Sequence, residues 1–165
     1  MRVGLVCPYS LDVPGGVQNH VCELAEALTV RGHSVSVLAP AAAELALPSY
    51  VVPAGRAVAV PYNGSVARLA FGPRALGRVR RWLDSGDFDL LHVHEPAAPS
   101  LSLLAAWVAG VPTVATFHTA RDGNRSRAMA AAGGVVRPGL QRIAARIAVS
   151  RQAEQTMRRH LGGSR

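Results

Sequence analysis

Two histidines of the sequence fall where predicted strands end, which is where residues able to do chemistry are expected in a parallel sheet. His94 closes the apolar run of residues 90–93, and His118 follows the run of residues 111–117. Ligands of open parallel sheets bind beyond the carboxyl ends of the strands. An imidazole there can hydrogen-bond a hydroxyl or a phosphate, and its ordinary pKa lies near neutrality. We therefore expect His118 to contact a ligand, with support of another functional group as the alternative.

A second histidine pair raises the question of a metal site. Alternation along a strand puts His92 and His94 on one face, with Glu95 beside them. Zinc needs at least three protein ligands, and the sequence offers no third cluster of His, Asp or Glu at matching spacing. We therefore predict no metal site and expect His92 to be a structural histidine with its hydrogen bonds satisfied. His94 and Glu95, at the strand end, are expected to be able to face a ligand.

Phosphate binding is the chemistry expected of Gly15 and Gly16. These glycines end a loop rich in proline and glycine, directly before a helical pattern. Free N–H groups and the helix dipole attract phosphate at such a helix start. The spacing is not GxGxxG and no Walker lysine follows, which disfavours a dehydrogenase or a P-loop nucleotidase. The alternative is a tight strand-to-helix turn without a ligand.

A basic stripe runs along a helix predicted from Pro73 to about Leu83. Its arginines stand at positions i, i+4 and i+7 of one face, with a fourth alongside: Arg74, Arg78, Arg81 and Arg80. Trp82 is adjacent, and the leucines and valine of the helix face the other way. Basic amphipathic helices with an interfacial tryptophan lie on anionic membranes. An ordinary solvated helix face is the alternative.

The elements that must position these residues alternate between strand and helix patterns, which is typical of a parallel α/β sheet. Residues 1–40 predict a βαβ unit whose helix ends at Arg31 and Gly32. Residues 41–53 are expected to be a connection with one helical turn, and the Asn-Gly pair at 63–64 predicts a hairpin at the sheet edge.

The rest of the chain completes this pattern. Strands are expected at residues 90–93, 111–117 and 147–149, with helices at 101–108, 140–146 and 152–160. About six sheet strands with crossover helices predict a Rossmann-like domain spanning residues 1–165.

Length and composition agree with one globular domain. The chain has 165 residues, of which 49% are hydrophobic, and it shows neither a basic start followed by an apolar leader stretch nor an apolar run near the roughly 20 residues of a membrane span. The two cysteines, Cys7 and Cys22, form no CxxC motif and are expected to be reduced thiols. We therefore expect a cytoplasmic protein.

The net charge of +8 lies in the last quarter of the chain. All 18 basic residues are arginine, and residues 121–165 contain 10 of them against 2 acidic residues. A basic tail is typical of proteins that bind nucleic acid or anionic lipid. The tail lacks the interleaved aromatic residues of a base-stacking surface. We therefore expect no nucleic-acid partner, and interpret the arginine content as compositional bias.

Several motifs together resemble the retaining glycosyltransferases of family 4, which have the GT-B fold. The resemblance runs from Met1 to about Ser150, and within the family it is greatest to actinobacterial members that transfer mannose from GDP-mannose to the inositol of phosphatidylinositol. The motifs that carry it are DVPGGVQ at 12–18, RGHSVSVLAP at 31–40, PYNGSVARL at 61–69, HEP at 94–96, ATFHT at 115–119 and RIAVS at 146–150.

This resemblance implies roles for individual residues. Gly16 matches a glycine that touches the donor diphosphate, and His118 matches a residue important for activity near the reacting inositol hydroxyl. Five residues match acceptor-side positions: Tyr9, Gln18, Tyr62, Asn63 and Arg68. The arginines Arg74, Arg78, Arg80 and Arg81 fall on the helix with which the family meets the membrane. No cofactor and no metal are implied.

The resemblance also implies the partners and the missing part of such an enzyme. The family has two Rossmann halves, the first for the acceptor and the second for most of the sugar nucleotide. We expect this chain to be the first half, located on the inner face of the cell membrane and inactive by itself. The alternatives are a non-catalytic lipid-binding remnant, a split enzyme completed by a separate polypeptide, and a family 4 half with a different acceptor.

Overall fold

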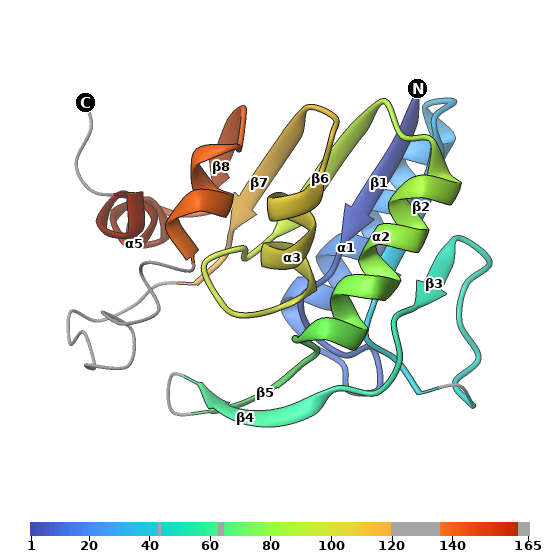
Figure 1. The fold of residues 1–165 in the computed structure, drawn as a ribbon, viewed down its shortest axis with the longest axis horizontal. Coiled ribbons are helices and arrows are strands. Elements are labelled where there is room, and N and C mark those ends of the chain that lie inside the picture. The colour runs from blue at the N-terminus through green and yellow to red at the C-terminus, as the bar shows by residue number, and fades with distance from the viewer. Residues whose placement is uncertain (43, 63–64, 120–135, 162–165) are drawn as a thin grey trace.

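The computed structural model describes residues 1–42, 44–62, 65–119 and 136–161. Its centre is a six-stranded sheet in the order β3-β2-β1-β6-β7-β8, in which all neighbouring strands are parallel (Figure 1). The strands are β1 (Arg2–Val6), β2 (Ser34–Ala39), β3 (Val51–Pro53), β6 (Leu90–His94), β7 (Thr113–Phe117) and β8 (Ala145–Ala148). The predicted Rossmann-like sheet with flanking helices is confirmed.

Helices cover both faces of this sheet. The helices are α1 (Gly16–Val30), α2 (Pro73–Gly86), α3 (Leu101–Val108) and α5 (Arg151–Leu161), and residues 136–141 are also helical. In Figure 1, α2 and α3 lie in front of the sheet, α1 lies behind it, and α5 lies beside the outer strand β8. Among the described residues no helix is long and apolar enough to cross a membrane.

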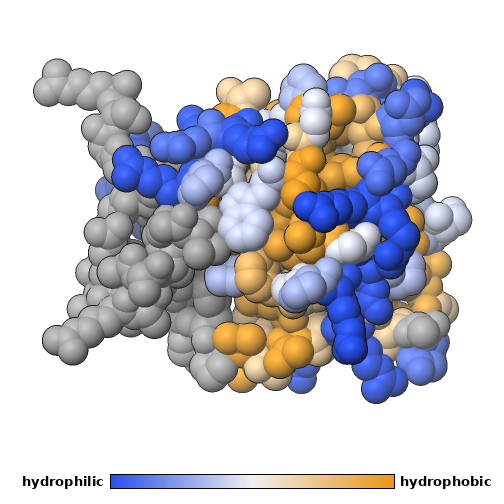
Figure 2. Space-filling view, in the orientation of Figure 1, coloured by the Kyte–Doolittle hydropathy of each residue, from blue (hydrophilic) through white to orange (hydrophobic). Residues whose placement is uncertain are grey.

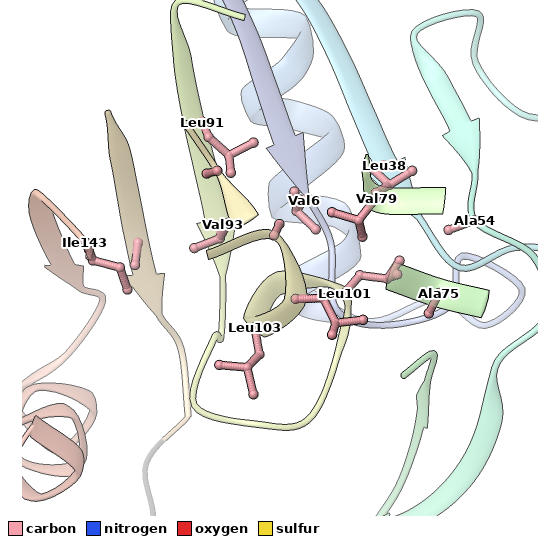
Figure 3. Close-up of a cluster of buried hydrophobic side chains, with 14 of the residues drawn as sticks. Val6, Leu38, Ala54, Ala75, Val79, Leu91, Val93, Leu101, Leu103 and Ile143 are labelled. Carbon is pink, nitrogen blue, oxygen red and sulfur yellow. The ribbon is translucent and has the colours of Figure 1, made fainter. Parts of the chain in front are cut away.

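The alternation of side chains along β1 divides the core into two layers. Leu5 faces the α1 layer, where it is buried with Val21 and Val37. Val6 faces the opposite layer, where side chains from α2, α3 and β6 close around it (Figure 3). The central strand is therefore apolar on both sides, as expected for a parallel sheet covered by helices.

Gly4 makes room on β1 for an aromatic residue of α2. A Cβ atom at Gly4 would lie only 2.8 Å from Cη2 of Trp82. Trp82 is 5% exposed, and its Nε1 donates a hydrogen bond to the Ser36 hydroxyl at 2.9 Å. The expectation of an interfacial tryptophan is therefore wrong, because Trp82 belongs to the core beneath α2.

The predicted hairpin exists but lies elsewhere than expected. Strands β4 (Val58–Tyr62) and β5 (Ser65–Leu69) form a separate antiparallel sheet beyond the carboxyl ends of the main strands (Figure 1). Tyr9 forms an isolated bridge with Leu69, and the Ser10 N–H donates to the Arg68 carbonyl at 3.0 Å. The hairpin thus joins the loop after β1 rather than the sheet edge.

Two further boundaries differ from the sequence prediction. The segment expected to be a connection contains β3, which pairs with β2 and forms the edge of the sheet. The helix expected over 140–146 covers 136–141 instead, and Ala145 already belongs to β8. Both segments are short and rich in alanine or proline, so their periodicity alone could not separate strand from loop or helix.

Candidate active site at the carboxyl edge of the sheet

Three histidine rings meet beyond the carboxyl ends of β6 and β7. His94 ends β6 and is fully buried, whereas His20 on α1 and His118 after β7 are partly buried. Nδ1 of His94 and Nε2 of His118 are 3.0 Å apart and share a hydrogen bond. The ring of His20 lies edge-on to both others, with centroid distances of 5.5 Å to His94 and 5.1 Å to His118.

The protonation of this cluster is set by burial. Burial lowers the pKa of His118 to about 4, and the neighbouring His20 adds to the effect. Burial lowers the pKa of His94 further, to about 2, with contributions from the histidines around it. The expectation that His118 titrates near neutrality is therefore wrong. Both rings are uncharged at pH 7 because a charge there would lose its hydration without gaining a carboxylate partner.

His92 is the structural histidine that the sequence predicted. Its Nε2 is 2.7 Å from the Thr116 hydroxyl, and its ring stacks on His94 with a centroid distance of 4.5 Å. The predicted common face of His92 and His94 is confirmed by this stacking. Burial is also the main reason that the pKa of His92 falls to about 4.

Glu95 positions the loop that carries His118. The Oε2 atom accepts hydrogen bonds from the backbone N–H of His118 at 2.9 Å and of Thr119 at 2.8 Å, and from the Thr119 hydroxyl at 2.8 Å. Glu95 is 2% exposed and adopts a left-handed backbone conformation, with φ of 49°. The expectation that Glu95 faces a ligand is wrong, since its carboxylate joins the ends of β6 and β7 instead.

Gly16 begins α1 beside open space. A Cβ atom at Gly16 would meet nothing within 4 Å, and the residue before it, Gly15, provides no side-chain cap for the first helical turn. The first N–H groups of a helix have no partner within the helix. The predicted phosphate site therefore has both the room and the donors that it requires.

Gln18 braces the loop in front of this helix start. Its Nε2 donates to the carbonyls of Ser10 at 3.2 Å and of Val13 at 3.1 Å. Its amide nitrogen is thus committed to the loop, so the structure adds a scaffold role to the acceptor role predicted for Gln18.

The loop after β1 is further organised by Asp12. Asp12 accepts hydrogen bonds from the Ala42 N–H at 2.8 Å and from the Ser10 hydroxyl at 2.7 Å. These bonds hold the pKa of the Asp12 carboxyl below its usual range, with smaller effects from the charges of Arg56 and Arg68. The exposed Arg68 side chain therefore acts on the same loop that leads to Gly16.

The remaining predicted acceptor residues lie on or near the hairpin. Tyr9 is partly buried and pairs with the hairpin at Leu69. Tyr62 ends β4, with its backbone opposite Ser65. Asn63 lies outside the described residues. The structure thus places Tyr9 and Arg68 beyond the carboxyl ends of the strands, as it does Gly16 and His118.

The four arginines predicted to contact a membrane are all exposed on α2: Arg74, Arg78, Arg80 and Arg81. Figure 2 shows hydrophilic atoms gathered over α2, beside the apolar surface in the centre of this face. Arg78 is the least free of the four, because its guanidinium donates to the Ala54 carbonyl at 2.5 Å. The basic stripe is therefore present, without the tryptophan that was expected to accompany it.

One residue of the cluster was missed by the sequence analysis. His20 lies far from the strand-end histidines in sequence and falls within a helical pattern, so no spacing rule joined it to them. The signal that could have found it is its place one turn after Gly16, at a helix start already assigned to the same edge of the sheet.

Comparison with known families decides what kind of domain this is. Residues 14–165 match the model of Glycosyltransferase Family 4. The chain belongs to this family. The family 4 assignment agrees with the motifs at the site, several of which contain the residues described above.

Curated relatives of this family 4 chain are named phosphatidyl-myo-inositol mannosyltransferases. The protein of Mycobacterium leprae is 56% identical over 162 residues, which is 98% of this chain and 43% of that protein. The Mycobacterium tuberculosis protein is also 56% identical and is covered to 42%, and that of Propionibacterium freudenreichii is 47% identical and covered to 44%. The family 4 chain thus spans less than half the length of the curated relatives it matches.

A solved structure shares the fold of the family 4 domain. Sucrose-phosphate synthase from Thermosynechococcus elongatus superposes with a TM-score of 0.58 at 15% identity, over 95% of this chain and 44% of that one. At this identity the likeness concerns the fold alone. It confirms the predicted fold class, a Rossmann-like parallel sheet with flanking helices.

Proposed function

We propose that this chain supplies the acceptor-binding half of a retaining mannosyltransferase that transfers mannose from GDP-mannose to the inositol of phosphatidylinositol. The observation that carries the proposal is the identity of 56% to mannosyltransferases of this name over 98% of the chain, a stretch that includes Gly16, Arg68 and His118. The geometry supports it, since these residues lie at or next to the carboxyl edge of the sheet.

His118 is proposed to orient the inositol hydroxyl that receives the sugar. An imidazole with a pKa of about 4 is a weak base, so its main contribution at pH 7 is positioning through a hydrogen bond. For Nδ1 of His118 to accept a hydrogen bond from the hydroxyl, its Nε2 must carry the hydrogen and donate to Nδ1 of His94. The tautomer of the buried His94 thus decides whether His118 can accept through Nδ1, and the proposal requires that Nδ1 of His94 be the acceptor.

The start of α1 is proposed to bind the donor diphosphate. Gly16 leaves space beside N–H groups of the first helical turn, and that turn contains no acidic residue. Arg68 is suited to the lipid phosphate, because a guanidinium donates two parallel hydrogen bonds to such a group. Tyr9, Gln18, Tyr62 and Asn63 are proposed to complete the acceptor side.

The exposed face of α2 is proposed to contact the inner surface of the cell membrane. Its arginines attract anionic lipid headgroups, at about 1 kcal/mol each near the surface. Apolar side chains on the neighbouring hairpin support the same contact, since Val58 is 69% and Val66 is 56% exposed. A peripheral protein of this kind needs no spanning helix.

A chimera tests the proposed function. Residues 1–165 replace the corresponding segment of the Mycobacterium tuberculosis relative, and transfer from radiolabelled GDP-mannose to phosphatidylinositol vesicles is measured. We expect transfer by the chimera and its loss on His118→Ala, with vesicle binding retained in both. A folded chimera that binds GDP-mannose but transfers to another lipid, or to none, would overturn the assigned acceptor.

A further inference from the structure

We propose that His20, His94 and His118 form a binding site for one divalent transition-metal ion of the zinc class. Each residue offers one ring nitrogen, and the three atoms all lie within 4.8 Å of one another. They come from three separate elements, α1, β6 and the segment after β7, which converge at one point. Metal binding requires neither donor nor acceptor, so it can be measured without the transferase reaction, although it uses the two nitrogens through which His94 and His118 share a hydrogen bond.

The spacing of the nitrogens is close to that of a tetrahedral site. Zinc–nitrogen bonds of about 2.1 Å place two ligand nitrogens roughly 3.4 Å apart. His94 and His118 already bring two nitrogens to 3.0 Å. The remaining nitrogen, on His20, lies within 4.8 Å of the other two and therefore needs to approach by about 1.4 Å at most to complete such a triangle. His20 is only partly buried on its helix, so a side-chain rotation can supply this movement.

The buried ring of His94 has an unused hydrogen-bonding atom. Its Nε2 has no hydrogen-bond partner among the described residues, although the atom is buried. Buried polar atoms without partners are rare and call for an explanation. A metal ion bound to Nδ1 of His94 and Nε2 of His118 would replace the hydrogen that these two atoms share, and Nε2 of His94 would then carry the hydrogen of that ring, so the support for the site comes from the shared nitrogen pair and not from Nε2.

The ligand chemistry selects the class of metal. Imidazole nitrogens bind zinc, copper and nickel, whereas magnesium and calcium require oxygen ligands. The carboxylate of Glu95, the residue after His94, already accepts three hydrogen bonds from the His118 loop. Three histidines also leave a fourth coordination position for a water molecule or a substrate oxygen. A phosphate ion fits less well, because it would require charged rings packed against one another.

Zinc binding by the purified chain tests this site. After treatment with EDTA, the chain is titrated with ZnCl₂ by calorimetry, and Co²⁺ is added separately to record its visible d–d absorption. We expect one Zn²⁺ per chain and a tetrahedral Co²⁺ spectrum. His20→Ala is expected to weaken Zn²⁺ binding at least tenfold, while circular dichroism shows an unchanged fold.

His33→Ala is the matched control, since His33 precedes β2 and is absent from the cluster. It is expected to bind Zn²⁺ as tightly as the parent chain. Binding that is absent in the parent, or that His20→Ala leaves unchanged, would overturn the proposal. Because a metal ion on His94 and His118 would displace the hydrogen bond between them, transfer by the chimera is measured in EDTA, which keeps the two tests separate.

Discussion

The carboxylate of Glu95 accepts a hydrogen bond from the backbone N–H of His118 at 2.9 Å. This bond ties the segment that follows β7 to the residue that follows β6. It therefore helps to position the His118 ring. The two residues are separated by 23 positions in the chain but lie at adjacent strand ends. The site residue predicted from the sequence thus depends on a neighbour whose role the sequence did not show.

Replacing Glu95 should loosen this strand-end connection. Glu95→Ala leaves the partly buried N–H groups of His118 and Thr119 without their acceptor, so we expect a loss of about 1–3 kcal/mol in the free energy of unfolding. Urea denaturation measures the change. In the chimera, transfer should fall together with it, because His118 loses its position.

Glu23→Ala is a suitable control, because Glu23 is exposed on α1. Glu23→Ala should change the free energy of unfolding by no more than about 0.5 kcal/mol. An equal loss in the two variants would show that Glu95 is not a special support of the site.

The buried histidines should make stability depend on pH. The pKa values of His92 and His118 fall from 6.5 to about 4 on folding, so the unfolded chain binds more protons than the folded chain between these values. The contribution of these two histidines to the free energy of unfolding is therefore fully present above pH 6.5, and it is lost as the pH falls toward 4. Between these pH values, each such group changes the free energy of unfolding by up to about 1.4 kcal/mol per pH unit.

Urea denaturation between pH 4 and pH 8, in the presence of EDTA, measures this slope. His118→Asn should flatten it, and His33→Asn serves as the control outside the cluster. A stability that does not change between pH 6.5 and pH 4.5 would contradict the burial argument.

A side chain at Gly16 should separate donor binding from folding. Gly16→Val adds atoms where nothing lies within 4 Å, so the free energy of unfolding should change by less than about 0.5 kcal/mol. The same atoms would occupy the space assigned to the diphosphate. We expect KM for GDP-mannose to rise at least tenfold in the chimera. Gly110→Val is the matched control, because Gly110 also has open space around it.

Membrane binding should depend on the arginines of α2. At about 1 kcal/mol for each arginine, the double variant Arg74→Ala and Arg81→Ala should bind anionic vesicles about 30-fold more weakly. Co-sedimentation with vesicles containing phosphatidylinositol measures this, and vesicles of phosphatidylcholine give the background. The double variant Arg31→Ala and Arg151→Ala removes two exposed arginines, one from the C-terminal cap of α1 and one from α5. Equal losses in both double variants would indicate attraction by net charge alone.

Gly4 should tolerate no side chain. The Cβ atom of Gly4→Ala would approach the Trp82 ring to 2.8 Å and Leu91 to 3.1 Å within the core. Overpacking of this kind lowers the free energy of unfolding by about 1–3 kcal/mol. Gly110→Ala, at an open position, should leave it nearly unchanged. Thermal unfolding of both variants provides the comparison.

The sequence predicted those parts of the fold that local patterns determine. Strand and helix periodicities gave the parallel sheet, and the glycine pair gave the start of α1. The sequence analysis did not predict the strand β3, because three residues are too few to show alternation. Trp82 was assigned to the surface because it stands next to arginines in sequence, whereas packing on Gly4 decides its burial.

Some residues of the site were predicted from the sequence and others were missed. His118 could be selected because a strand end is a local signal. His20 and the role of Glu95 depend on contacts between elements that the strand order brings together, and no pattern in the sequence reports that order. The low pKa of His118 has the same origin, since it follows from burial beside His20.

The position of β1 determines when the histidine cluster can form during synthesis. β1 is made first, yet one of its two partners, β6, pairs Val3 with Leu90. Until residue 94 has left the ribosome, one edge of the central strand has no partner from its own chain. The histidine cluster can form only later, once His118, which follows β7, has also left the ribosome. Nascent chains that end before this residue therefore present an open strand edge that invites chaperones or neighbouring chains.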